Sequence, residues 1–413
     1  MIWLSTFKRH LWDTASARQV IQQANRLLAY NAMADLDLRA EQARLLLEAA
    51  EINTLASVDA DTDQIRVFVE QSLTLLRLLN DRWYLAQGLT LLGMLLQRQG
   101  SLQESKQLLE EGLILWRELG DPRGTANSLE HLKRAFQVTG KFDESEALSR
   151  QAIAIFREVG DQRQLAKCLV ALSGTMLHGG KFAESMELVR ESIQIHQQLG
   201  LPTSPGFPTV SFAFALTHLG RYDEALHQQR QALLNQRKAM KDVEAFIDGP
   251  WPANQPLQNH FNSQQVLPDI HRSEVGYMCK DLGRTELALG MDEQSHQHLA
   301  RAVILFGSID DLNGLGQSLG CLGFLAYKQQ AYGEACEYIR ENLAVAKDSH
   351  FFLPSLTALC GVALLNIAAD VVETAVELYT LAQQHRHVAN SCWYADVVGS
   401  YIAAAATTLS PTA

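Results

Sequence analysis

The stretch that decides the fold is Gly100-Ser-Leu-Gln-Glu-Ser105, because close relatives of it return along the chain at a fixed interval. The returns begin at Gly140, Gly180, Gly220, Gly290, Gln330 and Asp370. Successive returns are 40 residues apart, except for one step of 70 between Gly220 and Gly290. A period in this range is typical of stacked supersecondary units rather than of one globular core. The sequence therefore predicts a repeat protein with a single insertion near residues 241–270.

A second signal lies 20 residues after the first in each unit, as in Leu119-Gly120-Asp121 and Val159-Gly160-Asp161. Glycine can adopt the left-handed conformation that ends a helix, and the aspartate after it can cap the next helix. Each unit is therefore predicted to be two helices joined by tight turns, and the fold class is all-α.

The turn series also predicts the domain organisation. The prolines Pro202, Pro205 and Pro208 delay the first helix of the fourth clean unit until about Pro208. Long connections without regular structure are uncommon in compact domains, and the proline-rich insertion has this character. The expected parts are an amino-terminal helical segment (1–37), repeats (38–240), an insertion loop (241–270), further repeats (271–390) and a capping segment (391–413) that closes the stack.

Composition limits the classes of function. The chain has 413 residues, 47% of them apolar, and a net charge of −11, which disfavours direct binding to a phosphate backbone. The amino terminus lacks the apolar stretch of a signal peptide, and no segment reaches the roughly 18 apolar residues of a membrane span. The cysteines show no Cys-x-x-Cys spacing and are interpreted as reduced core residues, so a cytoplasmic protein is expected.

Small residues indicate the type of repeat. Gly93, Ser105 and Gly112 are spaced by 12 and 7 residues, and Ser173, Ser185 and Ser192 repeat the spacing. Two helices that cross closely need small side chains where their backbones meet. The spacing resembles that of the tetratricopeptide repeat, which implies a right-handed superhelical solenoid of antiparallel helix pairs whose first helices line a concave groove. The chain departs from the pattern at Lys133, where a small residue is expected.

A narrower resemblance rests on the Leu-Gly-Asp linkers, the 40-residue period and the closing stretches 375–382 and 388–396. The chain resembles the carboxy-terminal repeat module of bacterial multidomain signal-transduction ATPases of the maltose-regulon activator type. The resemblance implies a non-catalytic scaffold that binds a protein partner, a peptide or a small inducer in signal transduction or transcription regulation. It also implies an ATPase domain on a neighbouring or upstream polypeptide. The alternative is a free-standing adaptor that bridges two other proteins.

No arrangement of residues predicts an enzyme, a cofactor or a metal site. The nearest approach to a phosphate loop, Gly174 to Phe182, is one residue too long and has Phe182 where a hydroxyl must bind magnesium. His296 and His298, and likewise His385 and His387, are two residues apart, which places them on different faces of a helix. Exposed polar surface is the favoured interpretation of both pairs.

The candidate binding groove follows from a second stripe on the first helix of the unit at 81–120, formed by Gln87, Thr90 and Met94. Carried along the 40-residue grid, this stripe predicts groove residues at Asn127, Glu130, Arg134, Lys167, Phe214, Tyr277, Lys280, Arg284, Gln317, Phe324 and Tyr327. Aromatic rings, cations and amides together suit a peptide, an acidic group or a sugar. For any one of these residues an ordinary solvated position is the favoured interpretation, whereas for the stripe as a whole binding is favoured.

The insertion is expected to fold over this groove, because Phe246, Trp251 and Phe261 supply apolar groups that can be buried there. The alternative is a disordered loop. The pocket under the insertion is predicted to be floored by Phe214, Tyr277, Lys280 and Arg284.

Overall fold

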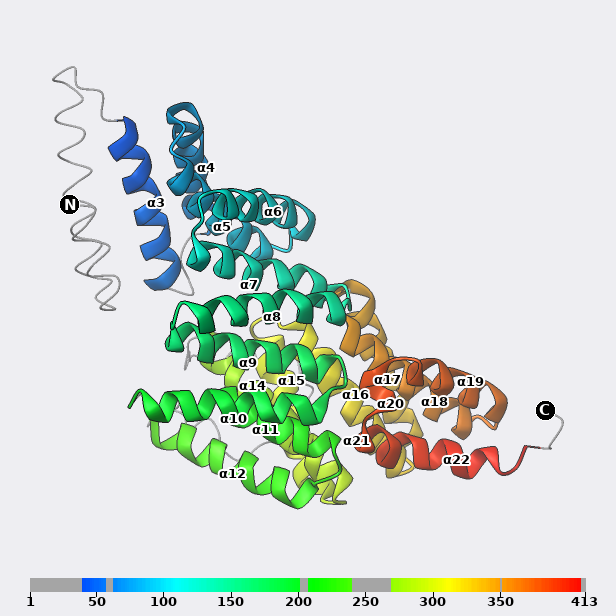
Figure 1. Cartoon of the computed structure of the whole chain (residues 1–413). Helices are drawn as coiled ribbons and strands as arrows, with labels where there is room; N and C mark the ends of the chain where they lie inside the picture. The colour runs from blue at the N-terminus through cyan, green and yellow to red at the C-terminus, as the bar shows by residue number, and fades with distance from the viewer. Residues whose placement is uncertain (1–38, 57–61, 201–206, 240–268, 350, 410–413) are drawn as a thin grey trace. The chain divides into compact units, whose positions relative to one another are not determined.

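A computed structural model describes residues 39–56, 62–200, 207–239, 269–349 and 351–409 (Figure 1). All regular structure in these ranges is helical. Consecutive helices pair as hairpins joined by short turns, which confirms the prediction of an all-α solenoid of antiparallel helix pairs. The predicted amino-terminal segment and almost all of the insertion, including Phe246, Trp251 and Phe261, lie outside the described residues.

The described residues form two compact units, one within 39–136 and 147–161, the other within 137–146 and 162–409. The first contains α3 (Arg39–Ala56), α4 (Thr62–Leu79), α5 (Arg82–Arg98), α6 (Leu102–Glu118) and most of α7 (Pro122–Val138) and α8 (Phe142–Glu158). The second contains α9 (Gln162–His178), α10 (Phe182–Gln198), α11 (Phe207–His218), α12 (Tyr222–Ala239), α14 (Asp269–Ala288), α15 (Asp292–Gly307), α16 (Leu312–Lys328), α17 (Tyr332–Ser349), α18 (Phe352–Ala368), α19 (Val372–Gln383), α20 (Arg386–Ala389), α21 (Cys392–Tyr394), η2 (Ala395–Gly399) and α22 (Ser400–Ala406).

The turns between helices have the predicted left-handed residue. At the end of α6, the Gly120 N–H donates to the Arg117 carbonyl (3.1 Å) and the Asp121 N–H to the Trp116 carbonyl (3.1 Å), which is a Schellman motif. Asp121 Oδ1 then accepts from the Gly124 N–H (2.8 Å) and caps α7. The same left-handed backbone occurs where the series has lost its glycine, at Asn80, Asp310, Gln330 and Asp370.

Small residues lie where paired helices cross. Ser105 Oγ donates to the Gly93 carbonyl at 2.7 Å, and Ser295 Oγ donates to the Gly283 carbonyl at the same distance. A methyl group on Gly93 would lie 2.6 Å from Leu109 Cγ, which is closer than packed carbons come. The spacing of small residues therefore records backbone contact between the two helices of a repeat.

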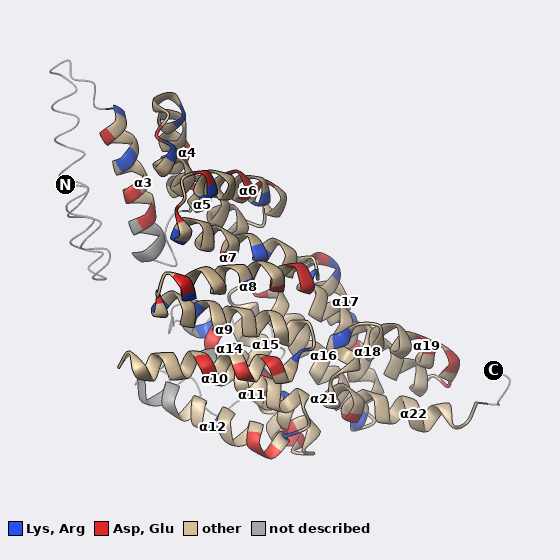
Figure 2. Cartoon of the chain, viewed as in Figure 1, with Lys and Arg blue, Asp and Glu red and all other residues tan. Residues whose placement is uncertain are grey.

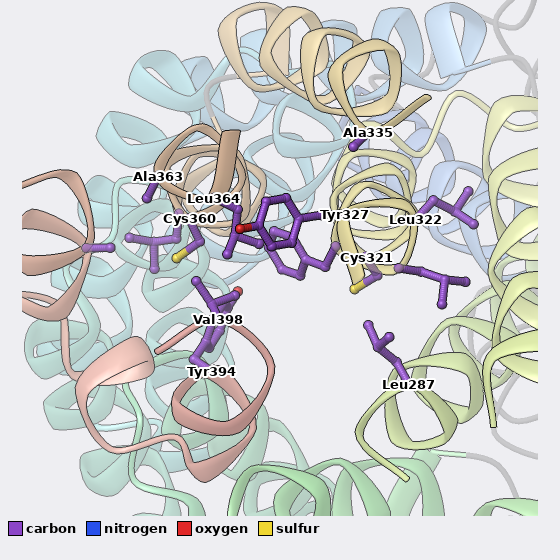
Figure 3. Close-up of a cluster of buried hydrophobic side chains, with 14 of the residues drawn as sticks. Leu287, Cys321, Leu322, Tyr327, Ala335, Cys360, Ala363, Leu364, Tyr394 and Val398 are labelled. Carbon is purple, nitrogen blue, oxygen red and sulfur yellow. The ribbon is translucent and has the colours of Figure 1, made fainter. Parts of the chain in front are cut away.

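The largest apolar core of the second unit joins its last repeats to the end of the chain (Figure 3). Tyr394 and Val398 extend from the carboxy-terminal helices towards Leu364 of α18 and Tyr327 of α16. Trp393 is buried completely. Residues between Val388 and Ile402 are therefore part of the core.

Residues 384–399, named here the closing segment, return to helices far earlier in the sequence. The His387 ring donates from Nδ1 to the Leu177 carbonyl (2.9 Å), across 210 residues of sequence. Asn390 Nδ2 donates to the Gly180 carbonyl (3.2 Å), and Arg386 forms an ion pair with Asp143 (3.2 Å). The second unit therefore closes on itself.

The contacts of two histidines, His387 and His298, correct the interpretation of these residues as exposed polar surface. His387 is 1% exposed because the closing segment folds against α9. His298 Nδ1 lies 2.7 Å from the Glu286 carboxylate, which is itself buried. Both rings have structural partners that the two-residue spacing did not indicate.

Charges of both signs are interspersed along the described helices (Figure 2). Many of them pair between neighbouring helices, as in Lys181 with Glu146 (2.6 Å) and Lys328 with Asp292 (2.6 Å). These pairs stay partly open to solvent, where an ion pair contributes little to stability, so the fold depends mainly on the apolar cores.

Candidate functional site: a cavity in the second unit

The second unit contains a cavity of about 290 Å³ between the first helices of five successive hairpins. It is lined by Gly174, Leu177 and His178 of α9; Val210, Ser211 and Phe214 of α11; Ser273, Glu274, Tyr277, Met278, Lys280 and Asp281 of α14; Asn313 and Gln317 of α16; and Leu353 of α18. The solenoid places these residues together because each first helix contributes one stripe to the same side.

A buried ammonium group is the most polar feature of the cavity. Lys280 Nζ lies 3.2 Å from Gln317 Oε1 and 3.2 Å from Asp281 Oδ1. The ammonium also lies over two rings, 4.9 Å from the centroid of Tyr277 and 5.5 Å from that of Phe214. Burial lowers the pKa of Lys280, and the carboxylate of Asp281 offsets part of that effect.

Arg284 forms a second cationic layer directly behind Lys280. One of its terminal nitrogens donates to Gln317 Oε1 (3.3 Å) and the other to His218 Nε2 (3.2 Å). The guanidinium carbon lies 4.9 Å from the centroid of the Trp393 ring and 5.2 Å from that of Phe214. The closing segment thus covers the side of Arg284 that faces away from the cavity, through the Trp393 ring.

A chain of amide hydrogen bonds holds the polar side of the cavity in one arrangement. Gln317 Nε2 donates to Asn313 Oδ1 (3.1 Å), and Asn313 Nδ2 donates to the Tyr277 hydroxyl (3.4 Å). The orientation of the Gln317 amide follows, because its oxygen must accept from Lys280 and Arg284, which are only donors. The polar groups are therefore oriented before any ligand enters.

The tautomer of His218 also follows from its partners. Arg284 can only donate, so His218 Nε2 accepts and the ring proton lies on Nδ1, 2.7 Å from Ser391 Oγ. Burial lowers the pKa of His218 well below its ordinary value, and the nearby cations Arg284 and Lys280 add to the shift. In the cavity wall, burial and then Lys280 lower the pKa of His178 to about 4. Both rings are neutral at neutral pH.

The structure brings together only some of the groove residues predicted from the sequence. Phe214, Tyr277, Lys280 and Gln317 line the cavity, and Arg284 lies behind it. Lys167 lies on α9 outside the lining. The remaining residues of the second unit, Phe324 and Tyr327, are buried in its core.

The predicted residues of the first unit, Asn127, Glu130 and Arg134, lie on α7. The Glu130 carboxylate accepts from Lys133 Nζ at 2.6 Å. Lys133 is thus buried with a partner of opposite charge at a position where the repeat pattern expects a small residue.

Sequence reasoning missed several lining residues. Ser273 and Asn313 lie one helical turn before the predicted Tyr277 and Gln317, so extending the stripe by four residues would have found them. Asp281 follows Lys280 directly, and its role as a buried counter-charge has no local signal.

No group of three or more His, Cys, Asp or Glu side chains that could hold a metal ion occurs among the described residues. In the same ranges no helix combines the length and the apolar character of a membrane span. Every cysteine in them is a free thiol, four buried and two exposed.

Fold and cavity together define a helical-repeat scaffold that encloses a preformed cavity. Residues 84–157 and 124–198 each match the family model for the tetratricopeptide repeat. The chain therefore contains tetratricopeptide repeats, as the spacing of its small residues predicted. No curated protein matched the chain.

Several solved structures share the fold at low identity. The apo form of the quorum sensor NprR from B. thuringiensis is 13% identical, with 93% of this chain and 97% of that chain covered and a TM-score of 0.57. The Rap conjugation gene regulator of plasmid pLS20, in complex with the Phr* peptide, is 11% identical, with 93% of each chain covered and a TM-score of 0.50. A signal transduction ATPase with a tetratricopeptide-repeat sensor from Pyrococcus horikoshii is 11% identical and has a TM-score of 0.47; this chain, of which 93% is covered, spans 55% of its length.

Proposed function

We propose that this chain is a non-catalytic sensor module, and that the cavity of its second unit binds a small molecule or the end of a peptide. The observation that supports this proposal most directly is the cavity itself. It is mostly apolar and has a few converging polar groups, which is the usual character of a ligand site. At about 290 Å³ it suits a small ligand or one end of a larger one.

The arrangement of the floor favours ligand binding over a structural role. A core that served stability alone would not place Lys280 and Arg284 side by side, because buried cations require desolvation. Such groups are often retained for recognition, and the hydrogen bonds through Gln317 hold them in place.

The regulatory part of the proposal rests on likeness of fold. A quorum sensor and a Rap regulator solved with a peptide have a similar fold. A shared fold alone does not establish a shared function. On this proposal, a protein partner responds to the ligand-bound state of the chain. The sequence resemblance implies that this partner is an ATPase domain on a neighbouring or upstream polypeptide.

Gly174 offers a direct test, because it lines the cavity and a Cβ built there meets no atom within 4 Å. Gly174→Phe should fill the cavity without a clash in the helix. We expect compounds that raise the melting temperature of the parent chain, found by screening small molecules and short peptides, to leave this variant unchanged. A ligand at 100 times its dissociation constant stabilises the parent by about 2.7 kcal/mol.

Gly333→Phe is the matched control, since Gly333 is also a helical glycine with open space around it but lies outside the cavity lining. Its ligand response should equal that of the parent. If ligands stabilise Gly174→Phe as strongly as the parent, the cavity is not the site. Binding of two proteins at once, unaffected by Gly174→Phe, would favour the adaptor alternative.

A further inference from the structure

We propose that the ligand of this cavity presents one carboxylate group to Lys280 and a short apolar group to the opposite walls. This inference rests on the proposed function and adds the chemical class of the ligand.

The first argument is the balance of buried charge. Lys280, Asp281 and Arg284 are 3%, 4% and 1% exposed, and they place two cations and one anion in the same buried layer. Asp281 is the one carboxylate of the described chain within 4.0 Å of either cation. An uncompensated buried charge is strongly unfavourable, so the layer attracts one more negative charge.

The second argument is the count of hydrogen-bond partners. Gln317 Oε1 accepts from both Lys280 and Arg284, and no acceptor reaches Arg284 Nε. Asp281 Oδ1 lies 3.2 Å from Lys280 Nζ as its ion-pair partner. The floor therefore has more N–H donors than acceptors. An oxygen pair at Lys280 would supply the missing acceptors.

The remaining walls define the rest of the ligand. Leu177, Val210, Met278 and Leu353 present apolar surface, and Phe214 presents a ring. Glu274 also lines the cavity and disfavours a second negative charge. A single carboxylate on an alkyl or aryl group fits this charge and volume better than a phosphate dianion does.

Two sources share this chemistry, a free carboxylic acid and the carboxy terminus of a peptide. The test uses four probes in two matched pairs: 4-phenylbutanoate with 4-phenylbutanamide, and acetyl-Gly-Leu with its carboxy-terminal amide. Dissociation constants are measured by ligand-detected NMR with the full chain. We expect at least one carboxylate to bind tenfold to a hundredfold more tightly than its amide, which corresponds to one charge-assisted hydrogen bond. The pair that shows this preference identifies the source.

Two variants should move the affinity in opposite directions. Lys280→Gln removes the charge and should abolish the preference for the carboxylate. Asp281→Asn removes the internal competitor and should tighten carboxylate binding severalfold. Lys347→Gln, the same change at an exposed lysine, is the control and should leave both affinities unchanged. The opposite expected signs distinguish lost binding from lost folding.

The outcomes separate this inference from the proposed function. Equal affinities for acid and amide, both lost in Gly174→Phe, would overturn the carboxylate assignment while the cavity remains a ligand site. No binding by any of the four probes at 20 mM would also overturn the assignment, and the screen against Gly174→Phe would then decide the broader proposal. A carboxylate preference that persists in Lys280→Gln would exclude Lys280 as the partner.

Discussion

At the scale of single residues, side-chain size decides where two backbones can meet. Two constraints act on Gly180. Its φ is +73°, and an added Cβ would lie 2.4 Å from the Arg386 carbonyl oxygen. The glycine is therefore needed both for the left-handed turn after α9 and for the approach of the closing segment.

Gly180→Ala should destabilise the chain for both reasons. A left-handed non-glycine residue costs about 1–2 kcal/mol, and the clash with the Arg386 backbone adds to it. Gly160→Ala separates the two effects, since Gly160 has a φ of +71° and no atom within 4 Å of an added Cβ. We expect urea unfolding to show a larger loss for Gly180→Ala, and hydrogen exchange at residues 385–391 to accelerate in that variant alone. Equal losses with unchanged exchange would contradict the proposed role of the contact.

The small residues at helix crossings support a second prediction. Ala225 of α12 is 0% exposed, so Ala225→Leu should overpack its hairpin and cost roughly 1–3 kcal/mol. Ala154→Leu, at an exposed position on α8, should change the free energy of unfolding by less than about 0.5 kcal/mol. The measurement is chemical denaturation, and an unchanged midpoint for Ala225→Leu would mean that the crossing is not tight.

At the scale of elements, the closing segment stands apart from the repeats. Its helices α20 and α21 have four and three residues, too few to be stable alone. They are held by tertiary contacts, which include buried histidine rings. The His218 and His387 rings lie 4.9 Å apart, and the Phe182 ring stacks on His218 at 4.6 Å.

Acid should therefore release the closing segment. Burial lowers the pKa of both His218 and His387 well below the ordinary value of 6.5. Below pH 6.5 the unfolded chain binds protons that the folded chain does not, so stability falls as the pH falls. Each such ring lowers the free energy of unfolding by about 1.4 kcal/mol for each pH unit below this value. The hydrogen-exchange protection factors of residues 385–398, which correct for slower intrinsic exchange in acid, should fall between pH 7 and pH 5.

Two variants test the assignment of this acid response. In His387→Gln the amide can still donate to the Leu177 carbonyl but cannot be protonated. The free energy of unfolding should therefore fall less steeply with falling pH, by the contribution of one histidine ring. His227→Gln changes an exposed histidine and should leave the profile unaltered. Equal profiles in all three proteins would exclude His387 as a contributor.

At the scale of the whole molecule, charge and backbone both argue against a nucleotide site. The net charge of −11 disfavours a triphosphate. The nearest approach to a phosphate loop, Gly174 to Phe182, spans the last turns of α9, a tight turn and the buried first residue of α10. Its backbone N–H groups from Gly179 to Lys181 bond to carbonyl groups of α9, so they cannot cradle a phosphate.

We therefore expect the purified chain to show no saturable binding of ATP with magnesium. Equilibrium dialysis with labelled ATP up to 1 mM would check this. A saturable micromolar affinity for ATP would contradict the proposal of a non-catalytic chain. ATP hydrolysis that persists after the protein is purified again would contradict it as well.

The repeat architecture was predictable from sequence alone because its signals are local. A left-handed residue, a cap and a helical stripe act within a few positions, so the 40-residue grid located the turns even at Gln330 and Asp370, where glycine is absent. The same periodicity predicted that Tyr277 and Gln317, which are 40 residues apart, lie on the same face of successive first helices. Their role in binding is a prediction.

Only the tertiary structure decided what occupies the groove. Phe324 and Tyr327 have the same stripe position as residues of the cavity, yet Trp393 of the closing segment packs against Phe324 and Tyr401 of α22 packs against Tyr327. Periodicity predicts which face of a helix points inward, but not which other segment of the chain packs against that face. The contact of His387 with Leu177 spans 210 residues, and the pairing of Lys280 with Asp281 depends on burial from five helices. Neither has a local signature, because the free energy of such contacts exists only once the separate repeats have stacked.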